Sequence, residues 1–119
     1  TDHPISEAAN VLIKNNSILK IGHDLNRFGD YTNDMIGEFL GIMKLSKIGT
    51  KILVDRYEKL EKSHVGKYYE RSSFESAYIV DIMQDLIDQG IDIKPIRVSG
   101  NWSEIDTQQD LENSKKLFF

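Results

Sequence analysis

The segment Gly100-Asn101-Trp102-Ser103-Glu104-Ile105-Asp106-Thr107 lies between two patterned runs of the chain. Before it, residues 91–98 alternate apolar and polar side chains, which is typical of a half-exposed strand. After it, residues 108–118 form an amphipathic run, and Thr107 with Asp110 has the spacing of a helix-capping pair. The segment therefore predicts a strand, a turn, a brief second strand and a helix start, and we expect the rest of the chain to be organised around it.

Two carboxylates in this segment, Glu104 and Asp106, are two residues apart, so they share one face of an extended backbone. Two such oxygen ligands at a strand end can hold a hard cation such as Mg²⁺. That cation would offset the charge of phosphate oxygens during phosphoryl or nucleotidyl transfer. The alternative is structural: an aspartate beside a helix start often acts only as a cap, and Glu104 would then be a solvated surface acid.

The composition narrows the class of protein. The chain has 119 residues, 39% hydrophobic and 29% charged, which suits one small globular domain with its own core. A net charge of -4 argues against a broad nucleic-acid-binding surface. The absence of cysteine excludes a disulfide framework and fits a cytoplasmic location. We also expect no membrane partner, because no apolar run approaches the roughly 20 residues that cross a bilayer.

The hydrophobic pattern predicts strands and helices of an α/β or α+β domain. Asn15-Asn16-Ser17 separates two short apolar runs and predicts a hairpin, and the most apolar segment, Met35 to Leu45, predicts a buried strand. The predicted strands are residues 11–13, 18–21, 35–45 and 91–98; the predicted helices are 47–64 after a Ser46 cap, 74–89 between Ser73 and Gly90, and 108–118. Because two helices separate the last two strands, we expect those strands to pair in parallel.

Two acids and one loop in this pattern have open interpretations. Glu38 lies between two glycines of the apolar segment, and glycines in a strand often mark close approach of a ligand or another element. Because an unpaired buried charge is costly, Glu38 either contacts a ligand or lies on a wet face of the sheet. Asp81 is either a satisfied core acid or a site residue. The loop at 65–72 combines basic and aromatic residues that could meet an anionic ligand, although an ordinary surface loop is the simpler interpretation.

Three blocks resemble, in this order, nucleotidyltransferases of the sugar-phosphate type. They are Gly37-Glu38-Phe39-Leu40-Gly41-Ile42, Ser76-Ala77-Tyr78-Ile79-Val80-Asp81, and Trp102-Ser103-Glu104-Ile105-Asp106-Thr107-Gln108-Gln109-Asp110-Leu111. The resemblance covers nearly the whole chain and is strongest to cytidylyltransferases that activate phosphocholine or phosphonates, including those fused to phosphoenolpyruvate mutase. The last block is fairly specific, whereas the other two are weak alone. The resemblance implies a Rossmann-like α/β sheet and transfer of a nucleoside monophosphate, from CTP, to a small phosphate or phosphonate.

The resemblance also implies roles for the tryptophan block. In the family, the aspartate of this block coordinates magnesium together with an aspartate from the first half of the domain. Asp106 takes that position here, so it is the expected metal ligand and catalytic residue. Glu104 is expected to orient the metal or the acceptor, and Trp102 to contact the substrate.

Three further positions are implicated in acceptor binding by the same resemblance. The G-E-F-x-G strand lies along the acceptor pocket in the family, which makes Glu38 and Gly41 candidate binding residues. A lysine near the end of the preceding strand often contacts phosphate. Lys20 is close to that position, while His23 stands where a lysine is common.

The family holds its nucleotide with a glycine-rich basic loop near the start of the domain, and these 119 residues contain no such stretch. We therefore expect residues 1–119 to be the C-terminal, acceptor-side portion of the domain, inactive alone and completed by an N-terminal half. The alternative is a non-catalytic binding, regulatory or oligomerisation module with the same half-fold, or a small stand-alone domain that binds a protein. Because half a sheet leaves an unpaired edge, we expect homo-oligomers of the isolated chain.

Overall fold

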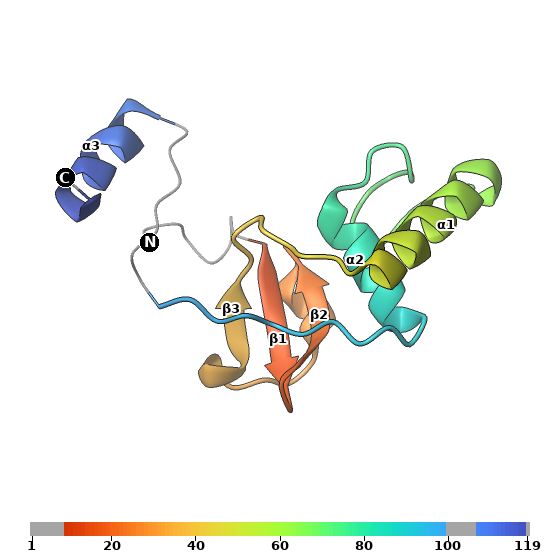
Figure 1. Cartoon of the computed structure of the whole chain (residues 1–119), viewed down its shortest axis with the longest axis horizontal. Helices are drawn as coiled ribbons and strands as arrows, with labels where there is room; N and C mark the ends of the chain where they lie inside the picture. The colour runs from red at the N-terminus through yellow and green to blue at the C-terminus, as the bar shows by residue number, and fades with distance from the viewer. Residues whose placement is uncertain (1–8, 100–106, 119) are drawn as a thin grey trace.

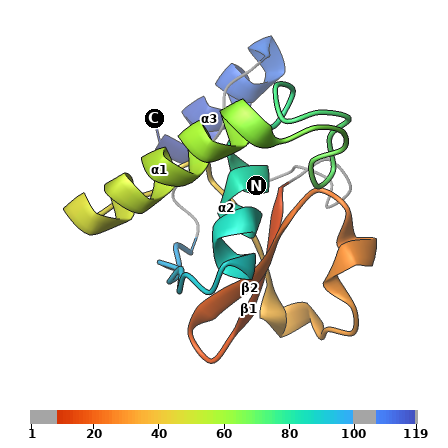
Figure 2. The same cartoon turned by 90° about the vertical axis from the view of Figure 1, so that its right-hand side faces the viewer.

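The computed structural model describes residues 9–99 and 107–118, which form a small α/β structure. Its elements are β1 (Asn10–Lys14), β2 (Ser17–Gly22), the short 3-10 helices η1 (Leu25–Phe28) and η2 (Asn33–Met35), β3 (Ile36–Glu38), α1 (Lys47–Ser63), α2 (Ile79–Asp88) and α3 (Gln108–Phe118). Figure 1 and the perpendicular view in Figure 2 agree that α2 lies between the sheet and α1. Every helix in the described part of the chain is too short or too polar to span a bilayer.

The predicted hairpin is confirmed by the antiparallel pairing of β1 with β2. Val11 pairs with Ile21 in this ladder. At the turn, Asn15 and Asn16 have φ angles of 53° and 60°. This left-handed backbone is the conformation that a two-residue type I′ turn requires, and asparagine tolerates it better than most side chains. The turn chemistry fixes the pairs next to it, Lys14 with Ser17 and Ile13 with Ile18. A bulge then shifts the register between Leu12 and Ile13, so that Leu12 pairs with Lys20.

Helix α2 covers one face of the sheet and forms the main core with it. The buried residues of this core are Val11, Ile13, Ile18, Ile21, Val80 and Met83. Burying an aliphatic side chain of this size contributes roughly 1.5–3 kcal/mol. The face of the sheet that α2 covers is therefore committed to stability. The opposite face is also largely covered, because Asn10 and Leu12 of β1 point to it and are only 2% and 4% exposed.

The sheet of the described residues is antiparallel, with strand order β2-β1-β3. The predicted parallel pairing of 35–45 with 91–98 is wrong, because residues 91–98 form no strand. The predicted strand at 35–45 is also too long, because only Ile36–Glu38 forms β3. Pairing with β1 ends where Glu38 meets Asn10, and one further bond joins the Phe39 amide to the Ala9 carbonyl at 2.8 Å. Gly41 then takes a φ of 81°, a backbone that leaves the strand direction. Apolar composition alone cannot show where pairing with β1 stops, and it therefore cannot show where β3 ends.

Residues 91–98, all of which the structure describes, form no regular strand, contrary to the alternation of their side chains. One backbone bond joins the segment to β2, from the Ile18 amide to the Ile93 carbonyl at 2.9 Å, and Figure 1 shows the segment crossing the sheet. Pro95 follows closely and has no amide hydrogen to continue a ladder. The prediction of a strand at 91–98 is therefore wrong, although Ile93 of this segment packs against the core.

The outer edge of β2 is occupied instead by a side chain of α2. Gln84 accepts from the Ile21 amide at 2.8 Å and donates to the Leu19 carbonyl at 3.4 Å. Its amide group therefore takes the place of the peptide that a neighbouring strand would offer. Because Gln84 is fully buried, these bonds are shielded from water, and this part of the edge is closed to a further strand.

The helix predictions hold for α1 and α3 and partly fail for α2. The Ser46 hydroxyl accepts from the Gly49 amide, so it is the predicted cap of α1. The Thr107 hydroxyl and the Asp110 carboxylate exchange bonds with each other's amides at 3.1 and 3.0 Å at the start of α3. Helix α2 begins at Ile79 rather than at residue 74, because Asp81 accepts from the Tyr78 amide at 2.8 Å and caps the helix there. Asp81 is thus a satisfied structural acid.

Candidate functional site

The three residues expected to act on the metal and substrate, Asp106, Glu104 and Trp102, lie outside the described residues. Within residues 9–99 and 107–118, no group of three histidine, aspartate or glutamate side chains is arranged to hold a metal ion. The magnesium prediction therefore depends on the tryptophan block alone and stays a prediction. The residues predicted to contact the acceptor, by contrast, can be placed on the fold.

Lys20 and Glu38 lie on the same face of the sheet, on its two outer strands. Lys20 pairs with Leu12, and Glu38 pairs with Asn10, two residues away on the central strand. Residues two apart on a strand share a face, and this is the face opposite the one covered by α2. With strands about 4.8 Å apart, the two Cα atoms are separated by roughly 12 Å. Both side chains are half-buried, whereas Asn10 and Leu12, which lie between them on the central strand, are buried.

Gly41 is exposed and lies three residues beyond Glu38. A Cβ added there would meet no atom of the described residues within 4 Å. Among the described residues, no other element of the chain closely approaches the backbone at Gly41, so this alternative of the prediction is not met. The φ angle of 81° lies in the left-handed region that favours glycine, so the local backbone conformation alone explains glycine at this position.

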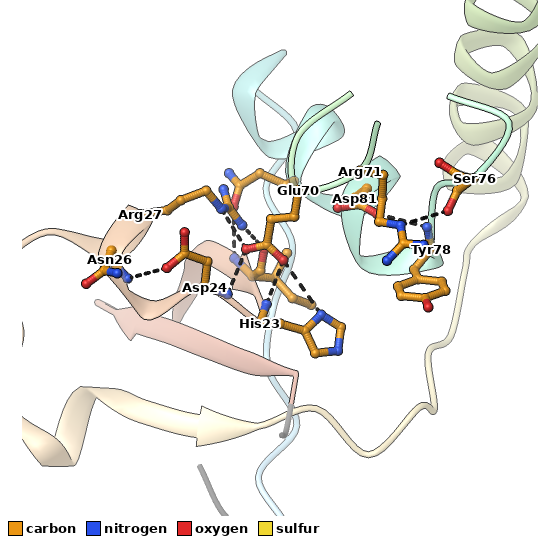
Figure 3. Close-up of polar contacts among 11 residues, drawn as sticks. His23, Asp24, Asn26, Arg27, Glu70, Arg71, Ser76, Tyr78 and Asp81 are labelled. Carbon is orange, nitrogen blue, oxygen red and sulfur yellow. Dashed lines mark hydrogen bonds and ion pairs between the residues drawn. The ribbon is translucent and has the colours of Figure 1, made fainter. Parts of the chain in front are cut away.

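The end of the sheet that carries Glu38 is held by a second cluster, centred on Glu70 (Figure 3). The carboxylate of Glu70 accepts from the backbone amides of His23 and Asp24, each at 2.8 Å, directly after β2. It also accepts from the Arg27 Nε atom at 2.8 Å. Glu70 lies in the loop between α1 and α2, so this contact ties that loop to the end of β2.

The Glu70 ion pair lies directly against the backbone at Gly22. A Cβ at this position would lie 2.3 Å from the Arg27 Nη2 atom and 2.6 Å from the Glu70 Oε2 atom. Arg27 also donates from Nη2 to the Ile21 carbonyl at 2.6 Å. Burial alone would raise the pKa of Glu70, but the bonds from the two amides and Arg27 outweigh it and lower the pKa. The carboxylate is therefore held in its charged form.

A third set of contacts continues from Glu70 to the start of α2. Arg71, the next residue, donates from Nε to the Ser76 carbonyl at 3.0 Å, and its guanidinium lies 4.3 Å from the centre of the Tyr78 ring. The ring of His23 meets Tyr78 edge-on, with the ring centres 6.0 Å apart. Figure 3 shows His23, Arg71 and Tyr78 gathered beside the Glu70 cluster. The arrangement can present positive charge and hydrogen-bond donors next to an exposed aromatic ring.

Tyr68 anchors the loop that carries Glu70 and Arg71 to α2. Tyr68 and Arg71 exchange backbone hydrogen bonds of 3.0 Å, and the Tyr68 hydroxyl donates to Asp85 at 2.7 Å. Burial, followed by this bond to the carboxylate, raises the pKa of Tyr68 well above its ordinary value. Asp85 is 1% exposed and also accepts from Arg56 Nε at 3.0 Å. This buried group is fully occupied within the fold, so we assign it a structural role.

A cavity of about 240 Å³ opens beside Asp85. Its lining residues are Arg56, Leu60, His64, Lys67, Tyr68, Tyr69, Asp85 and Gln89. The charged groups deepest in it, Arg56 and Asp85, are paired with each other. The cavity therefore offers no unpaired deep group to a ligand, and the sheet end is the stronger candidate site.

Sequence reasoning placed Glu38 and Lys20 among the candidates but missed the Glu70 cluster. Glu70 and Arg27 are 43 residues apart, and neither belongs to a motif with recognisable spacing. The weak signal for this region was the mixture of basic and aromatic residues at 65–72, which the simpler interpretation assigned to a surface loop. Gly22, next to His23, gave a second hint, because a glycine at a strand end can mark close packing against the backbone.

Comparison with known proteins gives one similarity over most of the chain. No protein-family model matches the chain, and no solved structure matches it. It is 26% identical over 110 residues to the CTP:phosphoglutamine cytidylyltransferase of Campylobacter jejuni subsp. jejuni. The match covers 92% of this chain but only 41% of the relative, so the chain spans less than half of that protein. The similarity supports a nucleotidyltransferase of the cytidylyltransferase type.

Proposed function

We propose that this chain is the acceptor-side portion of a magnesium-dependent cytidylyltransferase that moves CMP from CTP to a small phosphate or phosphonate. The observation that carries the proposal is the similarity to a cytidylyltransferase over 92% of the chain. The relative is more than twice as long as the matched part, which leaves room in it for a nucleotide-binding portion that this chain lacks. The resemblance of the tryptophan block to the family's metal-binding block supports the same assignment.

The proposed reaction is an in-line displacement at phosphorus. An oxygen of the acceptor's phosphate or phosphonate forms a bond to the α-phosphorus of CTP, the bond from that phosphorus to the bridging oxygen breaks, and pyrophosphate leaves. Positioning of the two substrates supplies much of the rate enhancement in such a step. Magnesium, held by Asp106 with the help of Glu104, would offset the negative charge of the phosphate oxygens. No covalent nucleophile of the protein is needed.

Residues on the sheet face opposite α2 hold the acceptor in this proposal. Lys20 attracts its phosphate, and Glu38, on the far outer strand, orients it by accepting a hydrogen bond. Gly41 allows the chain to turn away from β3 and leave the sheet end accessible. The candidate acceptors are phosphocholine and 2-aminoethylphosphonate, from the family resemblance, and phosphoglutamine, which the relative's name specifies.

The test compares the isolated chain with a longer polypeptide that includes the coding sequence upstream of Thr1. We expect that sequence to encode a glycine-rich basic loop. With CTP, Mg²⁺ and each candidate acceptor, the isolated chain should release no pyrophosphate above background, and the longer polypeptide should release it with at least one acceptor. Asp106→Asn should lower turnover about a hundredfold or more, since it removes the expected metal ligand. Asp30→Asn, at an exposed acid outside the candidate site, is the matched control.

Two results would overturn the proposal. Robust turnover by the isolated chain would show that it is no half-enzyme. An upstream sequence without a basic glycine-rich loop, together with no turnover by the longer polypeptide, would favour the non-catalytic binding module.

A further inference from the structure

We propose that Arg71, stacked on Tyr78 beside His23, binds a carboxylate at the non-reacting end of the acceptor. The inference rests on the proposed function and narrows its substrate class. It assigns to this chain a phosphorylated acceptor that carries a second anionic group, and it excludes one that ends in a quaternary ammonium ion.

The geometry of Arg71 is fixed before any ligand arrives. Its Nε atom donates to the Ser76 carbonyl at 3.0 Å, and Ser76 is itself held by a bond from its hydroxyl to the Ser73 carbonyl at 3.0 Å. The Cζ atom of the guanidinium lies over the Tyr78 ring, 4.3 Å from the ring centre. A guanidinium has five N–H donors, so the terminal nitrogens keep four for a partner. Such a pre-oriented fork matches the two oxygens of a carboxylate.

The charge of Arg71 is also uncompensated by any carboxylate in the described part of the chain. Arg27 is paired with Glu70 at 2.8 Å, and Arg56 is paired with Asp85 at 3.0 Å. The nearby carboxylate of Glu70 is taken by Arg27 and two backbone amides. Among residues 9–99 and 107–118, the Arg71 guanidinium contacts the Ser76 carbonyl and the Tyr78 ring and forms no ion pair. It is therefore available to an anionic ligand as far as the described residues are concerned.

The same stacking excludes a cationic ligand from Tyr78. Aromatic faces bind quaternary ammonium groups through the negative charge of the ring, and an aromatic surface near a phosphate site could serve that purpose. Here the guanidinium already occupies a face of the ring. A trimethylammonium group would have to approach next to a fixed positive charge. The exposed remainder of Tyr78, at 52%, then offers apolar contact rather than cation binding.

His23 is a second nitrogen-bearing side chain beside the same ring, and its Nδ1 atom lies 3.6 Å from the Glu70 Oε1 atom. Its side chain is 41% exposed, and its backbone amide is fixed by Glu70 at 2.8 Å. The imidazole lies edge-on to Tyr78, so its position is tied to the same ring that carries Arg71. Strand β2 ends at Gly22, the residue before His23. Gly22 and Glu38 both pair with Asn10 of the central strand, from opposite sides. The anion site therefore adjoins the sheet end to which we assigned the acceptor.

O-Phosphoserine and O-phosphoethanolamine form a matched pair of probes, because they differ only by one carboxylate. Binding of each to the full 119-residue chain would be measured by titration with ¹⁵N-detected NMR, which reads weak affinities and also reports the Arg71 Nε resonance. We expect phosphoserine to bind about tenfold or more tightly than phosphoethanolamine, since a bidentate charged contact is worth about 1.4 kcal/mol or more. The Arg71 resonance should shift with phosphoserine alone.

Variants then assign the preference to Arg71. Arg71→Met should abolish the difference between the two probes while leaving phosphoethanolamine binding unchanged. Arg71→Lys keeps the charge but loses the fork, so it should retain part of the difference and serves if the methionine variant does not fold. Arg97→Met removes an exposed arginine from the segment after α2 and should change neither affinity.

Three outcomes would overturn the inference. They are equal affinity for the two probes, an equal loss of both on Arg71→Met, and no binding of phosphoserine to the wild-type chain. An equal loss would mean that Arg71 holds the phosphate. None of these measurements requires CTP or turnover, so they are independent of the transferase assay. Phosphoserine preference without CMP transfer by the longer polypeptide would sink the proposed function and leave the carboxylate site standing.

Discussion

Substituting Glu70 by glutamine tests the contact that holds the candidate site together. The carboxylate accepts three hydrogen bonds of 2.8 Å, from the amides of His23 and Asp24 and from Arg27 Nε. A glutamine keeps one oxygen, and its NH₂ group would face donors instead of accepting from them. Hydrogen bonds to charged groups contribute roughly 1.5–3 kcal/mol each. With the side chain 12% exposed, so that water compensates part of the loss, we expect Glu70→Gln to lower the unfolding free energy by about 2–4 kcal/mol.

Urea unfolding followed by circular dichroism measures this difference in free energy. For a chain of this size the melting temperature should fall by roughly 10 °C. Glu58→Gln, on the exposed side of α1, is the matched control and should change stability by less than about 0.5 kcal/mol. A loss for Glu70→Gln no larger than that of the control would refute the view that Glu70 fixes the end of β2.

The pH dependence gives an independent check with a defined sign. The pKa of Glu70 is lower in the folded chain than its ordinary value of 4.5, because the amide and Arg27 bonds outweigh burial. A carboxylate with a lowered folded pKa stabilises the fold above its unfolded pKa, and the effect is lost as the pH falls through the folded pKa. The difference between wild type and Glu70→Gln should therefore stay constant near neutral pH and shrink below about pH 4.5. A difference that grew on acidification would contradict the assignment.

Three further substitutions test the surrounding packing by the same unfolding measurement. Gly22→Ala should destabilise by about 2 kcal/mol or more, because its Cβ would lie within 2.6 Å of the Glu70 ion pair; a neutral result would place that pair elsewhere. Gln84→Met should cost about 1–3 kcal/mol by leaving the buried Ile21 amide unpaired, and a variant as stable as wild type would show that this edge is solvated. Tyr68→Phe removes the donor to buried Asp85 and should cost about 1–2 kcal/mol, and no loss would mean that Arg56 suffices alone.

Local signals in the sequence were enough to predict the hairpin and two of the helices. Asn15-Asn16 specifies its turn through the left-handed backbone that asparagine tolerates, and Ser46 and Thr107 cap helices through side chains within three residues. Each of these signals acts between neighbours in the chain. A short stretch of sequence therefore contains both partners of the interaction that decides each turn or helix start.

The strand prediction at 91–98 failed and the one at 35–45 was too long, because a strand depends on a distant partner. Apolar composition reports that a segment is attracted to the core, but not whether a free edge remains for it. At β2 that edge is taken by the Gln84 amide, from a helix 63 residues away. No local pattern in residues 91–98 could reveal this competitor. The same reason applies to the candidate site. Lys20 and Glu38 could be named as candidates from the sequence, but their position on one face follows only from the register of β1 with β2 and β3.

The short loop between α1 and α2 links the stability of the fold to the geometry of the site. Tyr69 has a positive φ of 52°, an uncommon conformation for a large side chain, within the turn that Tyr68 and Arg71 close by mutual backbone bonds. The hydroxyls of Tyr68 and Tyr69 compensate by donating to Asp85 and to Asp88 of α2, at 2.7 and 2.6 Å. Inside this turn, Glu70 reaches the end of β2 while Arg71 reaches Tyr78. Because one turn aims both side chains, the core acid Asp85 positions the proposed anion site without touching a ligand.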